Sequence, residues 1–139
     1  MTACPSSPRA EALPLASTAA EEDWFKPCAV IPVYNHERTL PAVVAALQAE
    51  DLPCVLVDDG SSATAAPVLD PLAGQPAGHL HRHTHNHGKG AAVISGLREA
   101  ARLGFSHALQ VDADGQHELS RVGLLLDRAS QAPEAVICG

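Results

Sequence analysis

Two aspartates one residue apart, Asp112 and Asp114, are the side chains of this sequence best suited to hold a metal ion. They follow segment 108–111, which we expect to be a strand, and carboxylates at i and i+2 of such a backbone can reach a common point. Paired carboxylates suit Mg²⁺ or Mn²⁺, which bridge to phosphate oxygens. The alternative is a capping aspartate beside a solvated one. We favour the metal, because two carboxylates at the end of a buried strand repel each other.

A second acidic motif, Asp-Asp-Gly-Ser-Ser at 58–62, also follows an expected buried strand. Its carboxylates can accept hydrogen bonds from a base N–H or from ribose hydroxyls. The same residues are typical of a turn followed by a helix cap at Ser61 or Ser62. Both interpretations can hold together.

The segment Asn-His-Gly-Lys-Gly at 86–90 opens an expected helix. Its glycines let backbone N–H groups approach an anion, the helix N-terminus attracts that anion, and Lys89 adds a charge. The spacing is neither a Walker A loop nor G-x-G-x-x-G. The turn after the first strand, at 34–37, also lacks glycine, which argues against a nicotinamide-binding domain.

Five histidines recur at every second position, at 79, 81, 83, 85 and 87. On a strand they would share one face, which suggests a histidine-based metal site as one alternative. No Cys or carboxylate lies between them on that face, and the row is too long for one compact site. We favour a histidine-rich strand with one or two functional side chains near its end.

Apolar runs alternate with helical patterns from residue 27 onward, so we expect a tail at 1–26 and one domain at 27–139. The expected strands are 28–33, 53–57, 79–85, 107–111 and 135–138. The expected helices are one over 40–47, a short one before the Gly/Pro stretch 71–78, and two over 91–103 and 119–129. This order predicts an α/β fold, a mostly parallel sheet with right-handed crossovers and helices on both faces. Four loops, at 34–37, 58–62, 86–90 and 112–117, then leave the carboxyl ends of strands, where such sheets bind ligands, and they hold most of the unusual polar residues.

Composition excludes several classes of protein. The 139 residues carry a formal charge of -7, which argues against a nucleic-acid partner and a polybasic membrane anchor. No apolar run is long enough for a transmembrane segment, and no secretory signal is found, so we expect a cytoplasmic protein. Cys28, Cys54 and Cys138 each lie in apolar runs, as buried reduced thiols do.

Four motifs together resemble the nucleotide-binding half of family 2 glycosyltransferases, which have the GT-A fold. They are Ala-Val-Ile-Pro-Val-Tyr-Asn at 29–35, Val-Leu-Val-Asp-Asp-Gly-Ser-Ser at 55–62, Asn-x-Gly-Lys-Gly at 86–90 and Asp-Ala-Asp-Gly-Gln-His at 112–117. The last is most similar to the polyprenyl-phosphate mannose and glucose synthase branch. The resemblance spans residues 28–139, and it places the acceptor half and the catalytic base beyond the expected fifth strand. An apparently truncated chain would then expose apolar surface that the second half normally covers.

The resemblance implies a nucleobase pocket built from the first two loops. Pro32 and Tyr34 would line this pocket, and Asp59 would bond the base. Val57 would contact the base through its backbone. In the family, Tyr-Asn is usually followed at once by Glu. Here His36 intervenes, and the resemblance implies that Glu37 would be the glutamate of the donor site.

The resemblance also implies a diphosphate site built from the last two loops. Asp112, Asp114 and Gln116 would hold Mg²⁺ or Mn²⁺ on the donor diphosphate. Ala113 would contact the ribose through its main chain, and Lys89 would lie near the donor.

The implied activity is metal-dependent transfer of a sugar, with inversion, from a nucleoside-diphosphate sugar to an acceptor. The branch resembled suggests a lipid phosphate as that acceptor and the cytoplasmic face of a membrane as the place. The alternative is a non-catalytic module that binds nucleotide sugars. A sugar nucleotidyltransferase is the nearest competing enzyme, but it normally carries a glycine-rich basic loop after the first strand, which this sequence lacks.

Overall fold

Strand and helix alternate throughout the part of the chain that the computed structural model describes, residues 24–115 and 119–137. The strands are β1 (Pro27–Val33), β2 (Cys54–Asp59), β3 (Gly78–His83) and β4 (His107–Gln110). The α-helices are α2 (Leu40–Gln48), α3 (Ala66–Ala73), α4 (Lys89–Arg102) and α5 (Val122–Gln131). Two short 3₁₀ turns, η1 (Ala63–Ala65) and η2 (Leu119–Arg121), precede α3 and α5. No helix among the described residues is long and apolar enough to cross a membrane.

The strands form one sheet in the order β3-β2-β1-β4, and every neighbouring pair is parallel. β1 and β2 occupy the centre, where both faces of a strand are covered, and their apolar runs suit that place. After β1 the chain adds β2 and β3 on one side, and later places β4 on the other side of β1. The strand order therefore reverses between β1 and β4, and the carboxyl ends of these two strands flank a crevice.

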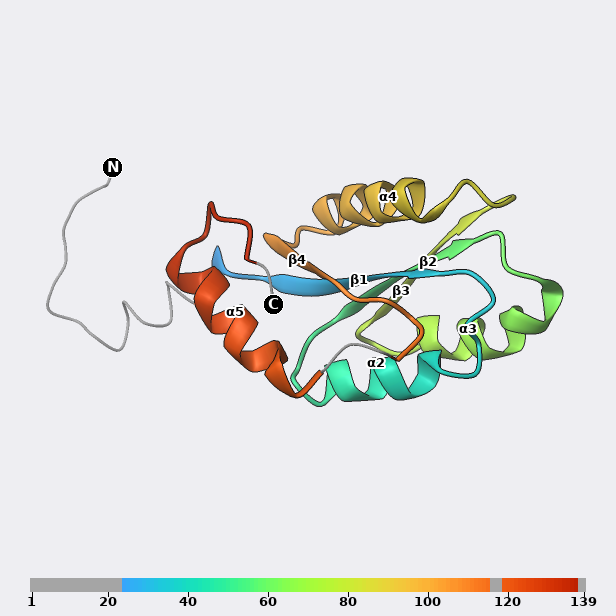
Figure 1. The fold of residues 1–139 in the computed structure, drawn as a ribbon, viewed down its shortest axis with the longest axis horizontal. Helices are drawn as coiled ribbons and strands as arrows, with labels where there is room; N and C mark the ends of the chain where they lie inside the picture. The colour runs from blue at the N-terminus through green and yellow to red at the C-terminus, as the bar shows by residue number, and fades with distance from the viewer. Residues whose placement is uncertain (1–23, 116–118, 138–139) are drawn as a thin grey trace, which may run out of the picture.

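Helices cover both faces of the sheet, as the sequence predicts (Figure 1). On one face, alternate residues of β1 such as Ile31 and Val33 form the larger core with Leu40 and Leu47 of α2. On the other face, α4 lies directly on the central strands. Its Gly96 is so close that an added Cβ would lie 2.3 Å from Val30 Cγ1. The small residue at this position therefore sets how near α4, and the loop before it, approaches the sheet.

Several predicted boundaries move. β2 continues through Asp58 and Asp59, β3 ends at His83 instead of residue 85, and α4 begins at Lys89 instead of 91. The predicted fifth strand over 135–138 is wrong over 135–137, which form no strand. An apolar run becomes a strand only beside a pairing partner, and Val136 is 91% exposed. Position 138 lies outside the described residues.

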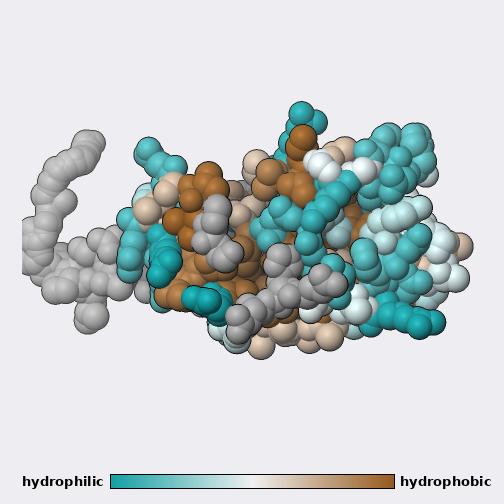
Figure 2. Space-filling view, viewed as in Figure 1, coloured by the Kyte–Doolittle hydropathy of each residue, from teal (hydrophilic) through white to brown (hydrophobic). Residues whose placement is uncertain are grey.

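Apolar surface remains exposed around the edge strand β4. Trp24 and Phe25 fold back against His107, with ring centroids 6.0 and 4.9 Å from it. Leu124 of α5 is 44% exposed. Figure 2 shows hydrophobic residues gathered where α5 and β4 lie, on the left half of the molecule.

The two cysteines among the described residues are buried and carry free thiols. Burial raises the pKa of Cys28 to about 12. Burial also raises the pKa of Cys54 to about 12, with a smaller contribution from the charge of Cys28. The prediction of buried reduced thiols is confirmed for these two, and Cys138 lies outside the described residues.

Candidate functional site

A cavity of about 230 Å³ opens at the carboxyl ends of the strands, at the point where the strand order reverses. The ends of β1 and β2, the loops after β1, β3 and β4, and the start of α4 contribute to its wall. The lining residues are Pro32, Val33, Tyr34, His36, Asp59, Asn86, Lys89, Ala92, Asp112, Ala113 and Asp114. The wall thus combines apolar side chains with carboxylates and one lysine, the composition expected of a pocket for a polar ligand.

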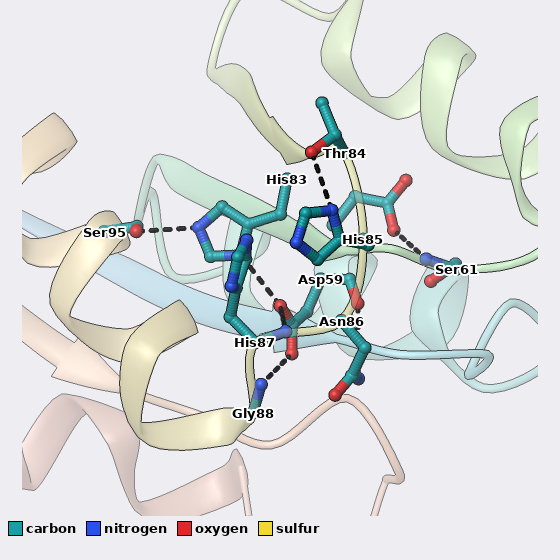
Figure 3. A network of polar contacts seen from close by, with 10 residues as sticks. Asp59, Ser61, His83, Thr84, His85, Asn86, His87, Gly88 and Ser95 are labelled. Carbon is teal, nitrogen blue, oxygen red and sulfur yellow. Dashed lines mark hydrogen bonds and ion pairs between the residues drawn. The ribbon is translucent and has the colours of Figure 1, made fainter.

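Asp59, at the end of β2, holds the loop that leads into α4 (Figure 3). Its carboxylate accepts hydrogen bonds from the backbone N–H groups of His87 and Gly88, both at 2.9 Å. It also lies 2.7 Å from Nδ1 of His83. Burial alone would raise the pKa of Asp59, but the bonds from His83, His87 and Gly88 and the charge interaction with His83 outweigh it and lower that pKa. Asp59 is therefore ionised at neutral pH and is 2% exposed.

The neighbouring Asp58 has a structural role. One of its carboxylate oxygens accepts from the backbone N–H of Ser61 at 2.8 Å, and the other accepts from Nε of Arg82 at 3.1 Å. Arg82 also bonds Asp70 of α3 at 2.8 Å. Together these bonds fix the turn after β2 from the face opposite α4, so the turn predicted for the motif at 58–62 is present. Ser62 precedes η1 but its side chain makes no cap hydrogen bond.

The loop after β4 is held at two points, the side chain of Asp112 and the main chain of Ala113. Nζ of Lys89 lies 2.6 Å from Oδ1 of Asp112, which also accepts from Nε2 of Gln110 at 3.1 Å. Thr39 Oγ1, at the start of α2, donates to the main-chain oxygen of Ala113 at 2.5 Å. These contacts hold the side chains of Asp112 and Asp114 at the cavity wall.

The carboxylates at the cavity fit a hard divalent cation that takes some of its ligands from the protein and the rest from a phosphate. Asp112 and Asp114 supply carboxylate oxygens to the same cavity, and Mg²⁺ commonly uses one or two carboxylates plus substrate phosphates. Within residues 24–115 and 119–137, no group of three or more His, Cys, Asp or Glu side chains is placed to hold a metal by itself. Gln116, the third predicted ligand, lies outside the described residues.

The histidine run does not form the metal site that its spacing suggests. Only His79, His81 and His83 lie on β3, while His85 and His87 belong to the loop that follows. The rings of His83 and His87 contact edge to face, with centroids 4.9 Å apart. Instead, the two ring nitrogens of His83 form hydrogen bonds with Asp59 and with Ser95 Oγ.

Seven of the nine predicted donor residues line the cavity, and two do not. Val57 lies in β2 with its side chain against α4, where a Cβ on Gly96 would be 3.0 Å from Val57 Cγ2. Glu37 turns to Thr64, whose Oγ1 donates to its Oε2 at 3.2 Å. Its other oxygen, Oε1, is buried without a hydrogen-bond partner in the described part of the chain.

Sequence reasoning omits several residues that the structure places at the site. His36, Asn86 and Ala92 line the cavity, and only Asn86 carries a signal, as the first residue of the Asn-x-Gly-Lys-Gly motif. Asn35 has φ 58, and its side-chain oxygen accepts from the N–H of Ser62 at 2.9 Å. This contact ties the loop after β1 to the loop after β2, and no local pattern could have predicted it.

The family model described as Glycosyl transferase family 2 matches residues 28–139. The chain belongs to this family. It is 30% identical over 112 residues to polyprenol monophosphomannose synthase from Mycolicibacterium smegmatis. The match covers 78% of this chain and 42% of that protein. It is 32% identical over 102 residues to UDP-N-acetylglucosamine–dolichyl-phosphate N-acetylglucosaminyltransferase from Methanococcus voltae, covering 63% of this chain and 41% of that protein.

A third relative is undecaprenyl-phosphate 4-deoxy-4-formamido-L-arabinose transferase from Pectobacterium atrosepticum. It is 32% identical over 115 residues, covering 77% of this chain and 34% of that protein. The family 2 chain described here thus spans less than half of the length of each of these relatives.

Solved structures agree on the fold. The chain resembles S. aureus TarS 1-349 with a TM-score of 0.56 at 20% identity, covering 75% of this chain and 33% of that one. The same protein in complex with UDP-GlcNAc gives a TM-score of 0.55 at 20% identity, covering 75% and 32%. The likeness confirms the predicted GT-A arrangement of the parallel sheet.

Proposed function

We propose that this chain forms the donor site of a glycosyltransferase that moves a sugar from a nucleoside diphosphate to an acceptor. The observation that carries the proposal is the cavity at the reversal of strand order. In a member of family 2, residues from four separate motifs meet there. A TarS structure bound to UDP-GlcNAc has the same fold, which supports a nucleotide sugar as the ligand.

The two sides of the cavity suit the two parts of such a donor. Pro32 and Tyr34 offer an apolar and an aromatic surface to a base, and Tyr34 is 47% exposed and free to stack. We propose that Lys89 and the carboxylates of Asp112 and Asp114, which also line the cavity, meet the diphosphate. In this proposal Lys89 turns from Asp112 to a phosphate oxygen when the donor binds.

The chemistry needs positive charge where the leaving phosphate becomes more negative. Lys89 supplies one such charge from this chain. A bound Mg²⁺ or Mn²⁺ would act as a Lewis acid there, and Asp112, Asp114 and Gln116 are the residues we propose to hold it. The acceptor attacks the anomeric carbon from the side opposite the diphosphate, which inverts the configuration.

The names of the relatives favour a lipid phosphate as acceptor, because polyprenol, dolichyl phosphate and undecaprenyl phosphate appear in them. A phosphate acceptor is already ionised and needs no general base, whereas a hydroxyl acceptor does. We place the reaction at the cytoplasmic face of a membrane, where nucleotide sugars are available.

Thermal unfolding with ligands tests the donor site. We expect UDP or GDP, or one of their sugars, to raise the unfolding midpoint with Mn²⁺ and much less with EDTA. At about 100 times the dissociation constant, the gain in unfolding free energy is about 2.7 kcal/mol. The Asp114→Ala variant should lose the metal-dependent part, while Asp127→Ala, a carboxylate removed from the exposed side of α5, should keep it. A midpoint that no nucleotide changes would contradict the proposal.

Transfer itself separates an enzyme from a binding module. Incubation of the chain with radiolabelled donor and a short polyprenyl phosphate should yield labelled lipid if the donor site works as part of an enzyme. Tight nucleotide binding with no lipid product, also when this chain is joined to the acceptor half that the resemblance implies, would favour the alternative, a module that binds nucleotide sugars.

A further inference from the structure

The imidazole of His83 connects β3 to both of its neighbours in space (Figure 3). Nδ1 lies 2.7 Å from Oδ1 of Asp59 on β2, and Nε2 lies 2.8 Å from Oγ of Ser95 on α4. The side chain is 11% exposed. A nearly buried ring that is bonded at both nitrogens has one fixed orientation. The donor chemistry described above makes no use of this residue.

The loop before α4 depends on the carboxylate that His83 holds. Gly88, the residue just before α4, has φ 99 and no side chain that could cap the helix. Asp59 instead holds the two residues that lead into the helix, because it accepts from the N–H groups of His87 and Gly88. The next residue, Lys89, is the one that reaches Asp112.

We propose that His83 is a positioning residue of the donor site. By fixing the carboxylate of Asp59, it fixes the backbone of His87 and Gly88, and thereby the point from which Lys89 reaches the diphosphate side of the cavity. The effect on nucleotide binding rests on the proposed function, whereas the effect on the loop does not.

The proton positions follow from the hydrogen-bond partners. Asp59 is ionised and can only accept, so Nδ1 of His83 carries the proton that joins the two side chains. The hydroxyl of Ser95 can donate to an unprotonated Nε2 or accept from a protonated one. The ring therefore keeps both bonds in either charge state.

Substitution at position 83 separates this role from simple packing. His83→Ala removes both bonds, whereas His83→Asn keeps an amide N–H at the δ position and can still donate to Asp59. The matched control is His79→Ala, on the same face of β3, where the ring packs against Phe105 at 6.0 Å between centroids. Each variant is examined by amide hydrogen exchange under NMR and by calorimetric titration with UDP and GDP.

We expect faster exchange at the amides of His87 and Gly88 in His83→Ala, and nucleotide binding weaker by about tenfold, which corresponds to about 1.4 kcal/mol. His83→Asn should restore most of both, and His79→Ala should change neither.

Unchanged exchange at both amides in His83→Ala would overturn the inference, and so would an equal loss in the Ala and Asn variants. A wild-type chain that binds no nucleotide would contradict the proposed function alone. In that case the exchange rates still decide whether His83 positions the loop.

Discussion

Replacement of Asp59 by Asn tests the physical basis of the site, because the change keeps the shape and removes the charge. The carboxylate accepts two backbone hydrogen bonds at 2.9 Å and one from His83 at 2.7 Å. An asparagine keeps one oxygen as acceptor but replaces the second oxygen with an NH₂ group. That group is a donor, so it cannot accept the hydrogen bond that the second carboxylate oxygen accepts in the wild type.

The expected cost follows from those three bonds. Hydrogen bonds to a charged group contribute about 1.5–3 kcal/mol each, neutral ones about 0.5–1.5, and an unsatisfied buried donor costs about 1–3. One donor loses its acceptor and the other two bonds lose their charge. Water can reach part of the exposed loop, so we expect Asp59→Asn to lower the free energy of unfolding by about 2–4 kcal/mol.

The pH dependence has a definite sign. The folded pKa of Asp59 lies below its usual value of 3.8. The charged carboxylate therefore stabilises the fold fully above about pH 4, and this contribution is lost as the pH falls through the folded pKa. The difference between wild type and Asp59→Asn should shrink below pH 3.8.

Urea unfolding at pH 7, 5 and 3, followed by circular dichroism, measures this difference. Asp51→Asn is the matched control: Asp51 is exposed and has φ 57, a conformation that Asn also tolerates. We expect less than about 0.5 kcal/mol from the control. A difference below that size for Asp59→Asn at pH 7, or one that stays the same at pH 3, would refute the reasoning.

Three further predictions concern other parts of the domain. Gly96→Ala should lower the free energy of unfolding by about 1–3 kcal/mol through overpacking against Val30, although alanine favours helices. Urea unfolding measures this change, and an unchanged free energy of unfolding would mean that α4 lies farther from the sheet. Lys89→Met should weaken UDP or GDP binding by about tenfold and leave nucleoside binding unchanged, as calorimetry can show. An equal loss of affinity for the nucleotide and for the nucleoside would place Lys89 at the base. Cys28 and Cys54 should react with Ellman's reagent only when the chain unfolds, because their thiols are buried with pKa raised to about 12; rapid labelling of both in native buffer would contradict their burial.

The sequence predicts the centre of the fold better than its boundaries. β1 and β2 are apolar on both faces, and the stripe from Leu40 to Leu47 marks the buried face of α2, so local patterns suffice there. The start of α4 depends instead on Asp59, a residue of another strand. The apolar run at 135–137 is typical of a strand in sequence, but no strand pairs with it within residues 24–115 and 119–137.

In the candidate site, too, local patterns predict one part and contacts between distant residues determine the other. The motifs predict most of the cavity, because loops at the carboxyl ends of parallel strands must converge. The contacts that hold those loops join distant residues and leave no local pattern. Thr39 bonds the main chain of Ala113 across 74 positions, and His83 bonds Asp59 across 24.

A titration followed by ¹⁵N–¹H NMR tests the central claim, that the cavity at the reversal of strand order binds a nucleotide sugar. UDP- and GDP-sugars are added with Mg²⁺ to the labelled chain. We predict saturable shifts at the amides of Asn86, Lys89 and Ala113, which line the cavity, and none at Gly74 or Gly104, which follow α3 and α4 at a distance from it. Shifts confined to residues outside the cavity, or none with any donor at millimolar concentration, would contradict the account.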